Sequence, residues 1–333
     1  MSKVTLADVA NEVNVSKTTV SMVLNNKGIN VSDETRKKIF EAAKKLNYVP
    51  NSLARSLSTK KTYTIGFIIP NIENPFFSEM AKAMETEAEK YSYSMILCNT
   101  FNNKEKEEDY VKLLISKLID GVAIVPTGEK SKSIEILKSN DIPFVILDRQ
   151  VDESDEINGV FCDNREGVKL GVKYLLNKGF KKIAFVDGNK YGIKNNSRLE
   201  YFCEIAKELD IFDEELVLKN EISLEGGINA TMELINKNKE IDAIFYGSDV
   251  MAIGGMKCLI RRGYSIPKDI SILGYDNIDI CSFVEPELTT IAQPIYKMGQ
   301  EACRLLIDEI NNKNSVKKVM DFKSYLVERR TVK

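Results

Sequence analysis

The sequence predicts an all-α helix-turn-helix domain at the N-terminus, followed by a larger α/β body with parallel sheets in two lobes. Short segments with apolar residues at helical spacing fill the first fifty residues. From Tyr63 onward, short apolar runs alternate with amphipathic stretches, which is typical of parallel strands joined by helices. The body spans about 270 residues, more than one such sheet usually holds, so we expect two lobes.

The composition argues against several classes of protein. The 333 residues include 43% hydrophobic and 29% charged side chains, a balance typical of globular proteins. No apolar run approaches the roughly 18 residues that span a bilayer, and the polar start of the chain is unlike a signal peptide. We therefore expect a cytoplasmic protein without a membrane partner.

The side chains that most often carry catalysis are sparse. The sequence contains no histidine, which excludes Ser-His-Asp and Cys-His catalysis and argues against an enzyme. It has no G-x-G-x-x-G or P-loop motif, so we expect no cofactor. The six cysteines lack the spacing of zinc ligands and are expected to be buried, reduced thiols.

Charge is distributed unevenly along the chain. Residues 1–62 carry 11 Lys and Arg against 5 Asp and Glu, a net charge of +6, whereas the remainder carries −8. A basic head on an acidic body indicates that only the head meets an anionic partner.

The first two predicted helices are short and closely joined. Thr5 can cap the first helix, with Asp8 completing a capping box. One face of this helix is apolar and contains Leu6, Val9, Ala10 and Val13. A tight connection at Asn14 leads to Ser16, which can cap a second helix ending at Leu24. This arrangement is typical of a helix-turn-helix.

The second predicted helix has two different faces. Its inward face contains Val20, Val23 and Leu24. Its outward face is mostly polar and weakly basic, and contains Lys17, Thr18, Ser21 and Met22. Such hydroxyl and ammonium groups can bond phosphates or base edges. This face favours DNA binding over the alternative, a plain three-helix bundle with solvated charges.

A third helix and a short segment complete the head. Ser32 can cap a helix from Asp33 to Leu46, with an apolar stripe of Ile39, Phe40, Ala43 and Leu46. After Pro50, apolar residues recur at helical spacing, at Leu53, Ala54 and Leu57. So short a helix is marginal in water. The segment is either an inert linker or a helix that forms only on a partner surface.

Four motifs in a fixed order resemble the LacI/GalR family of bacterial repressors. They are Val4–Ala10 (VTLADVA), Val15–Ser21 (VSKTTVS), Leu46–Asn51 (LNYVPN) and Ala54–Leu57 (ARSL). The similarity continues along essentially the whole chain. It implies a type I periplasmic-binding-protein-like body, a homodimer on two-fold double-stranded operator DNA, and control by a small-molecule effector.

The resemblance also implies limits for the domains. Residues 1–50 would form the helix-turn-helix domain, 51–61 a hinge helix or linker, and 62–333 the effector-binding and dimerisation domain. Lobe one would comprise 62–162 and 293–320, and lobe two 163–292 and 321–333.

By resemblance, the DNA-binding residues have distinct roles. Lys17, Thr18 and Met22 would read bases, and Leu57 would wedge into the minor groove at the operator centre. The full expected set is Thr5, Leu6, Ser16, Lys17, Thr18, Thr19, Ser21, Met22, Asn25, Asn51, Ala54 and Leu57. Family members often carry Arg where this chain has Met22, and methionine makes only apolar contact, for example with a thymine methyl.

Polar residues follow many of the predicted strands of the body, where open parallel sheets bind ligands. Carboxylates with amide and arginine partners suit sugar hydroxyls. The expected effector-binding residues, sharpened by the resemblance, are Asn74, Phe76, Phe77, Thr127, Asp148, Arg149, Lys194, Arg198, Asp249, Asp276 and Gln293. Asp187 also follows a predicted strand, whereas Ser248 and Asp249 can equally cap the following helix.

One pair of residues bears on the charge of the effector. Lys194 lies about one helical turn before Arg198. Together they would accept an anionic group, such as that of a sugar acid or sugar phosphate. In the alternative interpretation, Lys194 points to solvent.

The expected mechanism couples the effector to DNA. Effector bound between the lobes would change the separation of the hinge segments in the dimer, and so the stability of the DNA complex. Helix Phe76–Tyr91 carries Met80 and Met84, which face either the dimer interface or the sheet. The competing functions are a transport-system sugar-binding protein, which would lack the basic head, and a carbohydrate-active enzyme.

Overall fold

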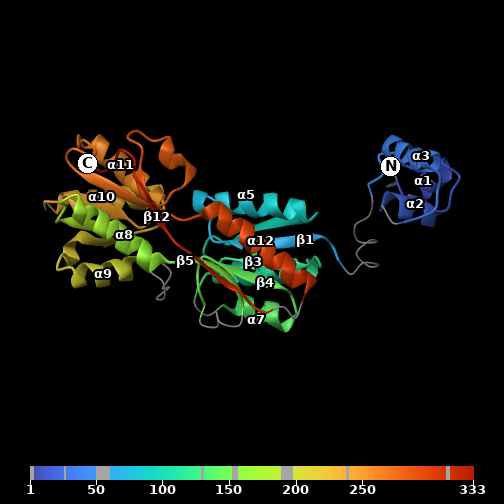
Figure 1. Cartoon of the computed structure of the whole chain (residues 1–333), viewed down its shortest axis with the longest axis horizontal. Coiled ribbons are helices and arrows are strands. Elements are labelled where there is room, and N and C mark those ends of the chain that lie inside the picture. The colour runs from blue at the N-terminus through green and yellow to red at the C-terminus, as the bar shows by residue number, and fades with distance from the viewer. Residues whose placement is uncertain are drawn as a thin grey trace. The chain divides into compact units, whose positions relative to one another are not determined.

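The computed structural model describes residues 4–25, 28–49, 61–128, 131–151, 157–188, 198–237, 240–312 and 316–333. The chain divides into two compact units, Met1–Thr62 and Tyr63–Lys333 (Figure 1). Four predicted site residues lie outside the described residues, namely Asn51, Ala54, Leu57 and Lys194, as does nearly all of the predicted hinge.

The first unit contains the predicted helices α1 (Leu6–Glu12), α2 (Lys17–Leu24) and α3 (Asp33–Lys45). Their N-termini begin where the sequence places caps. Thr5 and Asp8 form a capping box, Ser16 accepts a hydrogen bond from the Thr19 amide at 3.0 Å, and Ser32 accepts one from the Thr35 amide at 3.2 Å. These caps satisfy amides that a helix start leaves unpaired.

The apolar core of this unit differs from the prediction at one position. Val9, Val20, Val23 and Ile39 are fully buried, as their spacing predicts. Phe40, however, is 45% exposed, and Ala42 takes its place in the core. The prediction for Phe40 was wrong because α3 turns Ile39, Ala42 and Ala43 inward, which leaves no room on that side for residue 40.

The second unit contains two parallel-dominated sheets of matching topology. Sheet A has the strand order β11-β5-β4-β3-β1-β2, and sheet B the order β12-β10-β9-β8-β6-β7. Sheet A contains β1 (Thr64–Ile69), β2 (Ser94–Asn99), β3 (Gly121–Ile124), β4 (Phe144–Leu147), β5 (Asn158–Cys162) and β11 (Val319–Phe322). Sheet B contains β6 (Ile183–Asp187), β7 (Val217–Lys219), β8 (Ala243–Tyr246), β9 (Ser271–Asp276), β10 (Thr289–Ala292) and β12 (Tyr325–Val327). All pairs are parallel except β10–β12.

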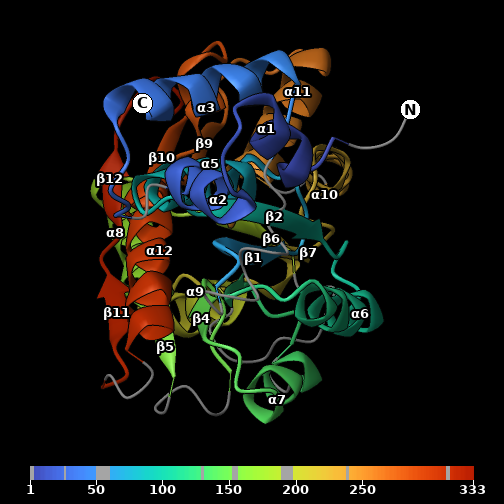
Figure 2. The ribbon, with the colours of Figure 1, turned by 90° about the vertical axis from the view of Figure 1, so that its right-hand side faces the viewer.

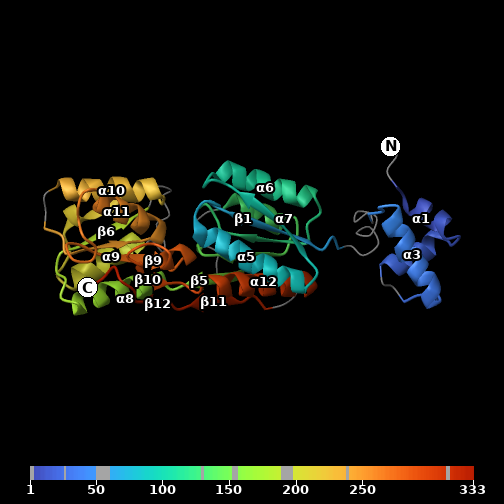
Figure 3. The same cartoon turned by 90° about the horizontal axis from the view of Figure 1, so that it is seen from above.

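Helices cover both faces of each sheet. On sheet A, α5 (Pro75–Lys90) and α12 (Ile295–Asn311) pack on one face, and α6 (Lys104–Ser116) and α7 (Lys132–Ser139) on the other. Figure 2 shows α12 and α6 on opposite sides of the strands. On sheet B, α8 (Asn164–Asn177) and α9 (Arg198–Glu208) lie opposite α10 (Leu224–Asn236) and α11 (Asp249–Arg261) (Figure 3). Lobe two also contains the short helices η2 (Glu214–Leu216) and η3 (Asp279–Ser282).

The sequence predicts nine strands in the body, at 64–69, 94–98, 121–125, 143–147, 159–162, 182–186, 243–246, 271–274 and 289–292, and each is confirmed to within two residues at each end. Three short strands were not predicted, namely β7, β11 and β12. β11 has only four residues, and each of them is exposed or half-buried, so its sequence carries little strand signal. It stays in sheet A to Phe322, so the chain leaves lobe one two residues later than the predicted boundary at 320.

The chain passes between the lobes at three places in the described residues. These are Cys162–Asp163 after β5, Ala292–Gln293 after β10, and Lys323–Ser324 between β11 and β12. The first and third crossovers are tied directly, because the Asp163 amide donates to the Phe322 carbonyl at 2.9 Å. None of the helices in the described ranges is long and apolar enough to cross a membrane.

Candidate nucleic-acid interface and ligand site

The outward face of α2 presents the predicted base-reading residues. Lys17 and Thr18 are exposed in the first turn, and Met22 is half-buried one turn later. Ser16 and Thr19 also bond to each other through their hydroxyls at 2.9 Å. The Ser16 cap fixes the residue at which α2 begins and so places Lys17 and Thr18 in its first turn, at the helix end that favours anions.

The other predicted DNA-binding residues of this unit have internal partners. Thr5 donates from both its amide and its hydroxyl to Asp8, each at 2.8 Å. Leu6 packs against the small core. The Asn25 amide group donates to the Ser21 carbonyl at 2.7 Å and closes the end of α2. These residues shape the surface on which Lys17 and Thr18 stand.

Arg198 is the centre of the candidate ligand site in the second unit. One guanidinium nitrogen lies 3.0 Å from the Asp276 carboxylate and donates to the Gly247 carbonyl at 2.5 Å. Its Nε donates to the Asn164 side-chain oxygen at 2.9 Å. The guanidinium carbon lies 3.8 Å from the centre of the Tyr275 ring, a cation–π contact. The sequence predicted Arg198 and Asp276, but not Asn164 or Tyr275.

Carboxylates surround this guanidinium. Asp276 and Asp187 come from lobe two, at the ends of β9 and β6, and Asp148 comes from lobe one, after β4. All three carboxylates interact electrostatically with Arg198. Burial raises the pKa of Asp187 to about 6, against the opposing effect of Arg198. Burial likewise raises the pKa values of Asp276 and Asp148 above the usual range.

Two of these carboxylates sit on unusual backbone. Asp148 has φ 62° and Asp276 has φ 117°, backbone conformations that residues other than glycine seldom adopt. Such strain persists only where the surroundings impose it, and it gathers at ligand sites. Two carboxylates on constrained backbone, one from each lobe, therefore interact electrostatically with Arg198.

Gln293 and Ser248 hold polar atoms that lack partners. The Gln293 amide nitrogen donates to Asp276 at 2.8 Å, but its Oε1 is buried with no partner in the described chain. Ser248 is 2% exposed, and its hydroxyl also finds no partner there. Ser248 precedes α11 but accepts no capping bond. Since buried polar atoms are normally satisfied, both point to a ligand. Ser248 thus occupies the N-cap position of α11 without a side-chain capping bond.

Asp249 is engaged within lobe two. Its carboxylate accepts from the Thr290 hydroxyl at 2.7 Å and from the Ile278 amide at 3.1 Å. It is fully buried, and burial together with the charge of Asp276 raises its pKa. These bonds connect α11 to β10 and to the loop after β9, so Asp249 stabilises the arrangement of these elements within lobe two.

The lobe-one residues divide into two groups. Phe76 and Phe77 form an edge-to-face pair at 5.1 Å and start α5, which Asn74 caps by accepting from the Phe76 amide at 3.1 Å. Thr127 donates from its amide and its hydroxyl to Glu107, at 2.7 and 2.5 Å. Thr127 is therefore already hydrogen-bonded within lobe one, and its place in the effector site stays a prediction.

Arg149 connects the loops that follow strands β3 and β4 of sheet A. Its guanidinium donates to the Pro126 carbonyl at 3.2 Å and lies 3.9 Å from Asp148. A second direct link connects the lobes themselves, because Glu79 on α5 accepts from the Asp279 amide at 2.8 Å. Partial burial raises the pKa of Glu79.

The raised pKa of Asp187 predicts a pH-dependent stability. Because the folded protein holds this proton more tightly than the unfolded chain, stability is expected to fall as pH rises from about 4 to about 6. The loss attributable to Asp187 is at most about 3 kcal/mol. Urea unfolding at several pH values measures it. Asp187→Asn should flatten the slope, and an unchanged slope in that variant contradicts the prediction.

Comparison with known proteins identifies the two units separately. Residues 5–51 match the description "Bacterial regulatory proteins, lacI family". Residues 62–329 match "Periplasmic binding proteins and sugar binding domain of LacI family". A ribose operon repressor of Halalkalibacterium halodurans is 40% identical over 93% of this chain and 91% of its own length.

Two solved structures extend the comparison. The lac repressor dimer bound to operator and the anti-inducer ONPF superposes with a TM-score of 0.86, at 27% identity, over 99% of both chains. A LacI family regulator from Enterococcus faecalis V583 with bound ribose gives a TM-score of 0.72 at 32% identity, over 81% of this chain and 98% of that one.

Proposed function

This chain belongs to the LacI family of bacterial regulatory proteins, and from that premise we propose that it represses pentose-utilisation genes under the control of a neutral sugar such as ribose. Members of this family are DNA-binding repressors rather than enzymes, which confirms the prediction from the missing histidines. The proposed place of action is the cytoplasm, where operator DNA lies.

The chemistry around Arg198 carries the proposal for the effector. Two of the three guanidinium nitrogens already have partners, and the carboxylates of Asp148, Asp187 and Asp276 surround the cation. A carboxylate accepts hydrogen bonds from hydroxyls but repels an anion. A hydroxyl-rich neutral ligand is therefore favoured over a phosphate or sugar acid.

The related proteins favour ribose as the sugar that acts as effector. The 40% identical relative is named for a ribose operon, and two related regulators were solved with bound ribose. The unpartnered Gln293 Oε1 accepts a hydroxyl proton, and the Ser248 hydroxyl either accepts or donates. Phe76 and Phe77 would supply the apolar surface that covers one face of a sugar ring.

Calorimetric titration tests the effector. The full chain should bind ribose, and should bind ribose 5-phosphate at least roughly tenfold more weakly, because the phosphate enters beside carboxylates. The alternative, an anionic effector held by Lys194 and Arg198, predicts the reverse order. In that case Lys194→Ala should remove the preference for the phosphate.

The proposed DNA complex uses Lys17, Thr18 and Met22 of α2 in the major groove. The hinge, 51–61, would fold on DNA with Leu57 as the minor-groove wedge. A bound sugar would change the lobe arrangement, and so the separation of the two hinges in a dimer.

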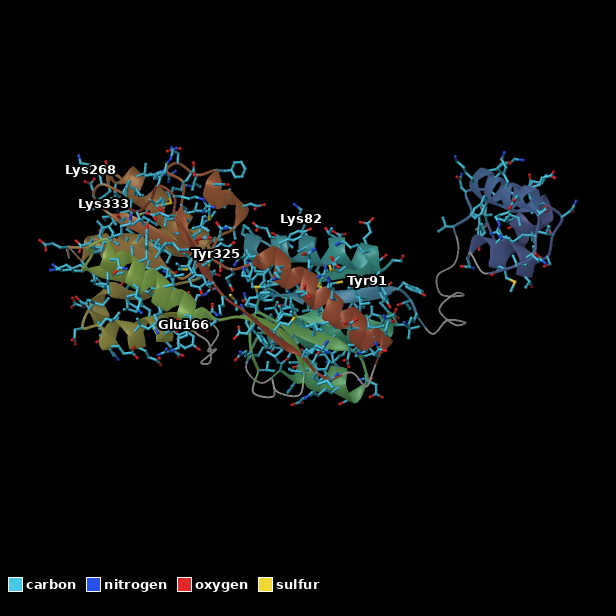
Figure 4. The ribbon with its side chains drawn as sticks, in the orientation of Figure 1. Lys82, Tyr91, Glu166, Lys268, Tyr325 and Lys333 are labelled. Carbon is cyan, nitrogen blue, oxygen red and sulfur yellow. The ribbon has the colours of Figure 1, made fainter. Side chains whose placement is uncertain are left out.

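The proposed dimer uses the edge of sheet A. Met80 and Met84 are fully buried against the sheet, so they are not available to a second subunit. By contrast, β2 is the outermost strand, and Ile96 and Leu97 are 38% and 39% exposed on it. Tyr91, the residue that follows α5, is 43% exposed (Figure 4). Exposed apolar edges are normally covered, and a related repressor is a dimer.

A charge on this edge should separate the subunits. Ile96→Lys combined with Leu97→Lys is expected to yield monomers that bind ribose normally but bind a two-fold operator at least roughly a hundredfold more weakly, since each monomer holds one half-site. Sedimentation and DNA titration measure both effects. Ile260→Lys, at an exposed position on α11, is the control and should remain dimeric. A dimeric edge variant would exclude this interface.

A further inference from the structure

Ser324 lies in the third crossover, where the chain leaves β11 and enters β12. The next residue, Tyr325, marks this place in Figure 4. The Ser324 hydroxyl is 3.2 Å from the Tyr275 hydroxyl and 3.3 Å from the Cys162 thiol. Tyr275 belongs to β9 in lobe two, and Cys162 ends β5 in lobe one. One hydroxyl thus connects two crossovers with the interior of lobe two.

Tyr275 connects this cluster to the ligand site. The Arg198 guanidinium stacks on the Tyr275 ring, and the hydroxyl of the same tyrosine contacts the Ser324 hydroxyl. Tyr275 is fully buried, so the ring has little freedom to move without moving both partners. A displacement of the guanidinium therefore reaches Ser324 through one rigid side chain.

Helix α8 closes the cluster from the opposite side. A Cβ at Gly167 would collide with the Tyr275 hydroxyl and lie 2.9 Å from the Ser324 hydroxyl. Only glycine lets the helix approach the pair so closely. The tyrosine is consequently held between Arg198 and α8, and Ser324 is its only described hydroxyl partner.

The contact is also long for its type. Hydroxyl–hydroxyl bonds usually measure about 2.7–2.8 Å, so a separation of 3.2 Å leaves a weak bond that a small shift can strengthen or break. A second route is direct, because Asp276 bonds to both Arg198 and Gln293, and Gln293 stands in the second crossover. Arg198 therefore reaches all three crossovers of the described chain.

We infer that Ser324 is a positioning residue, which transmits the placement of Arg198 on Tyr275 to the lobe crossovers and so couples sugar binding to DNA binding. The inference rests on the proposed function. Among the described residues, the Ser324 hydroxyl is paired with Tyr275 and Cys162 and not with Arg198 or its carboxylates, so its loss should change the coupling between the two ligands more than the affinity for either one.

The experiment compares Ser324→Ala with the unaltered full chain. Ribose affinity is measured by calorimetry, and operator affinity with and without ribose at one salt concentration. Coupling in such regulators changes affinity by roughly 5- to 150-fold. In Ser324→Ala we expect this ratio to fall at least about threefold, while the separate affinities change less than about twofold. Ser324→Thr retains the hydroxyl and should restore the ratio.

A double-mutant cycle tests the route. Tyr275→Phe keeps the ring for Arg198 but removes the hydroxyl, so it should lower the ratio as Ser324→Ala does, and the double variant should go no lower. Ser139→Ala removes an exposed serine hydroxyl on α7 and is the control. A normal ratio in Ser324→Ala, or additive losses in the double variant, would overturn the inference.

A separate measurement distinguishes failure of the effector proposal from failure of the inference about Ser324. If the unaltered chain does not bind ribose, the proposed effector is wrong. Amide hydrogen exchange without ligand then decides the role of Ser324. Protection of the crossover amides near Asp163 should fall equally in Ser324→Ala, Tyr275→Phe and the double variant. Unchanged protection would reject the connection.

Discussion

A chain that starts at residue 61 is expected to lose at least about a thousandfold in operator affinity while keeping its affinity for ribose. Specific operator binding typically exceeds non-specific binding by this factor or more. Residues 1–60 carry 10 Lys and Arg against 5 Asp and Glu, a net charge of +5, and residues 61–333 carry 37 against 44, a net charge of −7, so the truncated protein should repel DNA. Because the two units are separately compact, the ligand site should survive. Fluorescence anisotropy across salt concentrations measures the loss.

Point variants locate this effect on α2. In the full chain, Lys17→Ala or Thr18→Ala should weaken operator binding roughly 10- to 100-fold, the cost of one good base or phosphate contact. Lys268→Ala, on lobe two, removes a surface lysine far from the head in sequence and should have no such effect (Figure 4). If the truncated chain binds the operator with the same affinity as the intact chain, the assignment of DNA binding to the head is wrong.

Replacement of Arg198 by methionine should abolish ribose binding and destabilise lobe two by roughly 3–5 kcal/mol. Removing one partner of a buried ion pair leaves the other charges uncompensated. Here Asp276 loses a partner at 3.0 Å, and Asp148 and Asp187 lose its field. Without the cation their pKa values should rise further, so the loss should shrink below about pH 5.

A matched control separates this effect from the loss of any arginine. Arg165→Met on α8 removes an exposed guanidinium paired with Glu204 and Glu208 at the surface, which should cost less than about 1 kcal/mol. Urea unfolding at pH 5 and 7.5 compares the two variants, and calorimetry compares their ribose binding. Equal stability in both variants, or ribose affinity retained in Arg198→Met, would contradict the central role of Arg198.

Local sequence signals located the elements of both units closely. Caps such as Ser16 and Ser32 stand at the residues where α2 and α3 begin. Strands such as β1, β8 and β10 begin and end as their apolar runs predict. These signals succeed because capping and burial act within a few residues of the chain. β11 and β12 escaped notice because their burial is partial and their pairing partners are remote in sequence.

The ligand site was predicted only in part. Arg198, Asp148, Asp276 and Gln293 followed from strand ends and from resemblance, and the structure brings them together. Thr127 is hydrogen-bonded to Glu107, twenty residues earlier, and Asp249 to Thr290. Neither internal partner has a local sequence signal, and the place of both residues in the effector site stays a prediction. Tyr275 follows the predicted strand 271–274 and was not singled out, although it contacts both Arg198 and Ser324.

The sequence by itself determined the family, the helix-turn-helix head, the alternating strands and helices of the body, and the residue types available to a ligand. Only the tertiary structure decided which acids face Arg198, that the Ser248 hydroxyl makes no capping bond, and that Ser324 bridges two crossovers. The reason is physical: propensity and periodicity act along the chain, whereas hydrogen-bond partners are chosen by which strand ends the fold brings together.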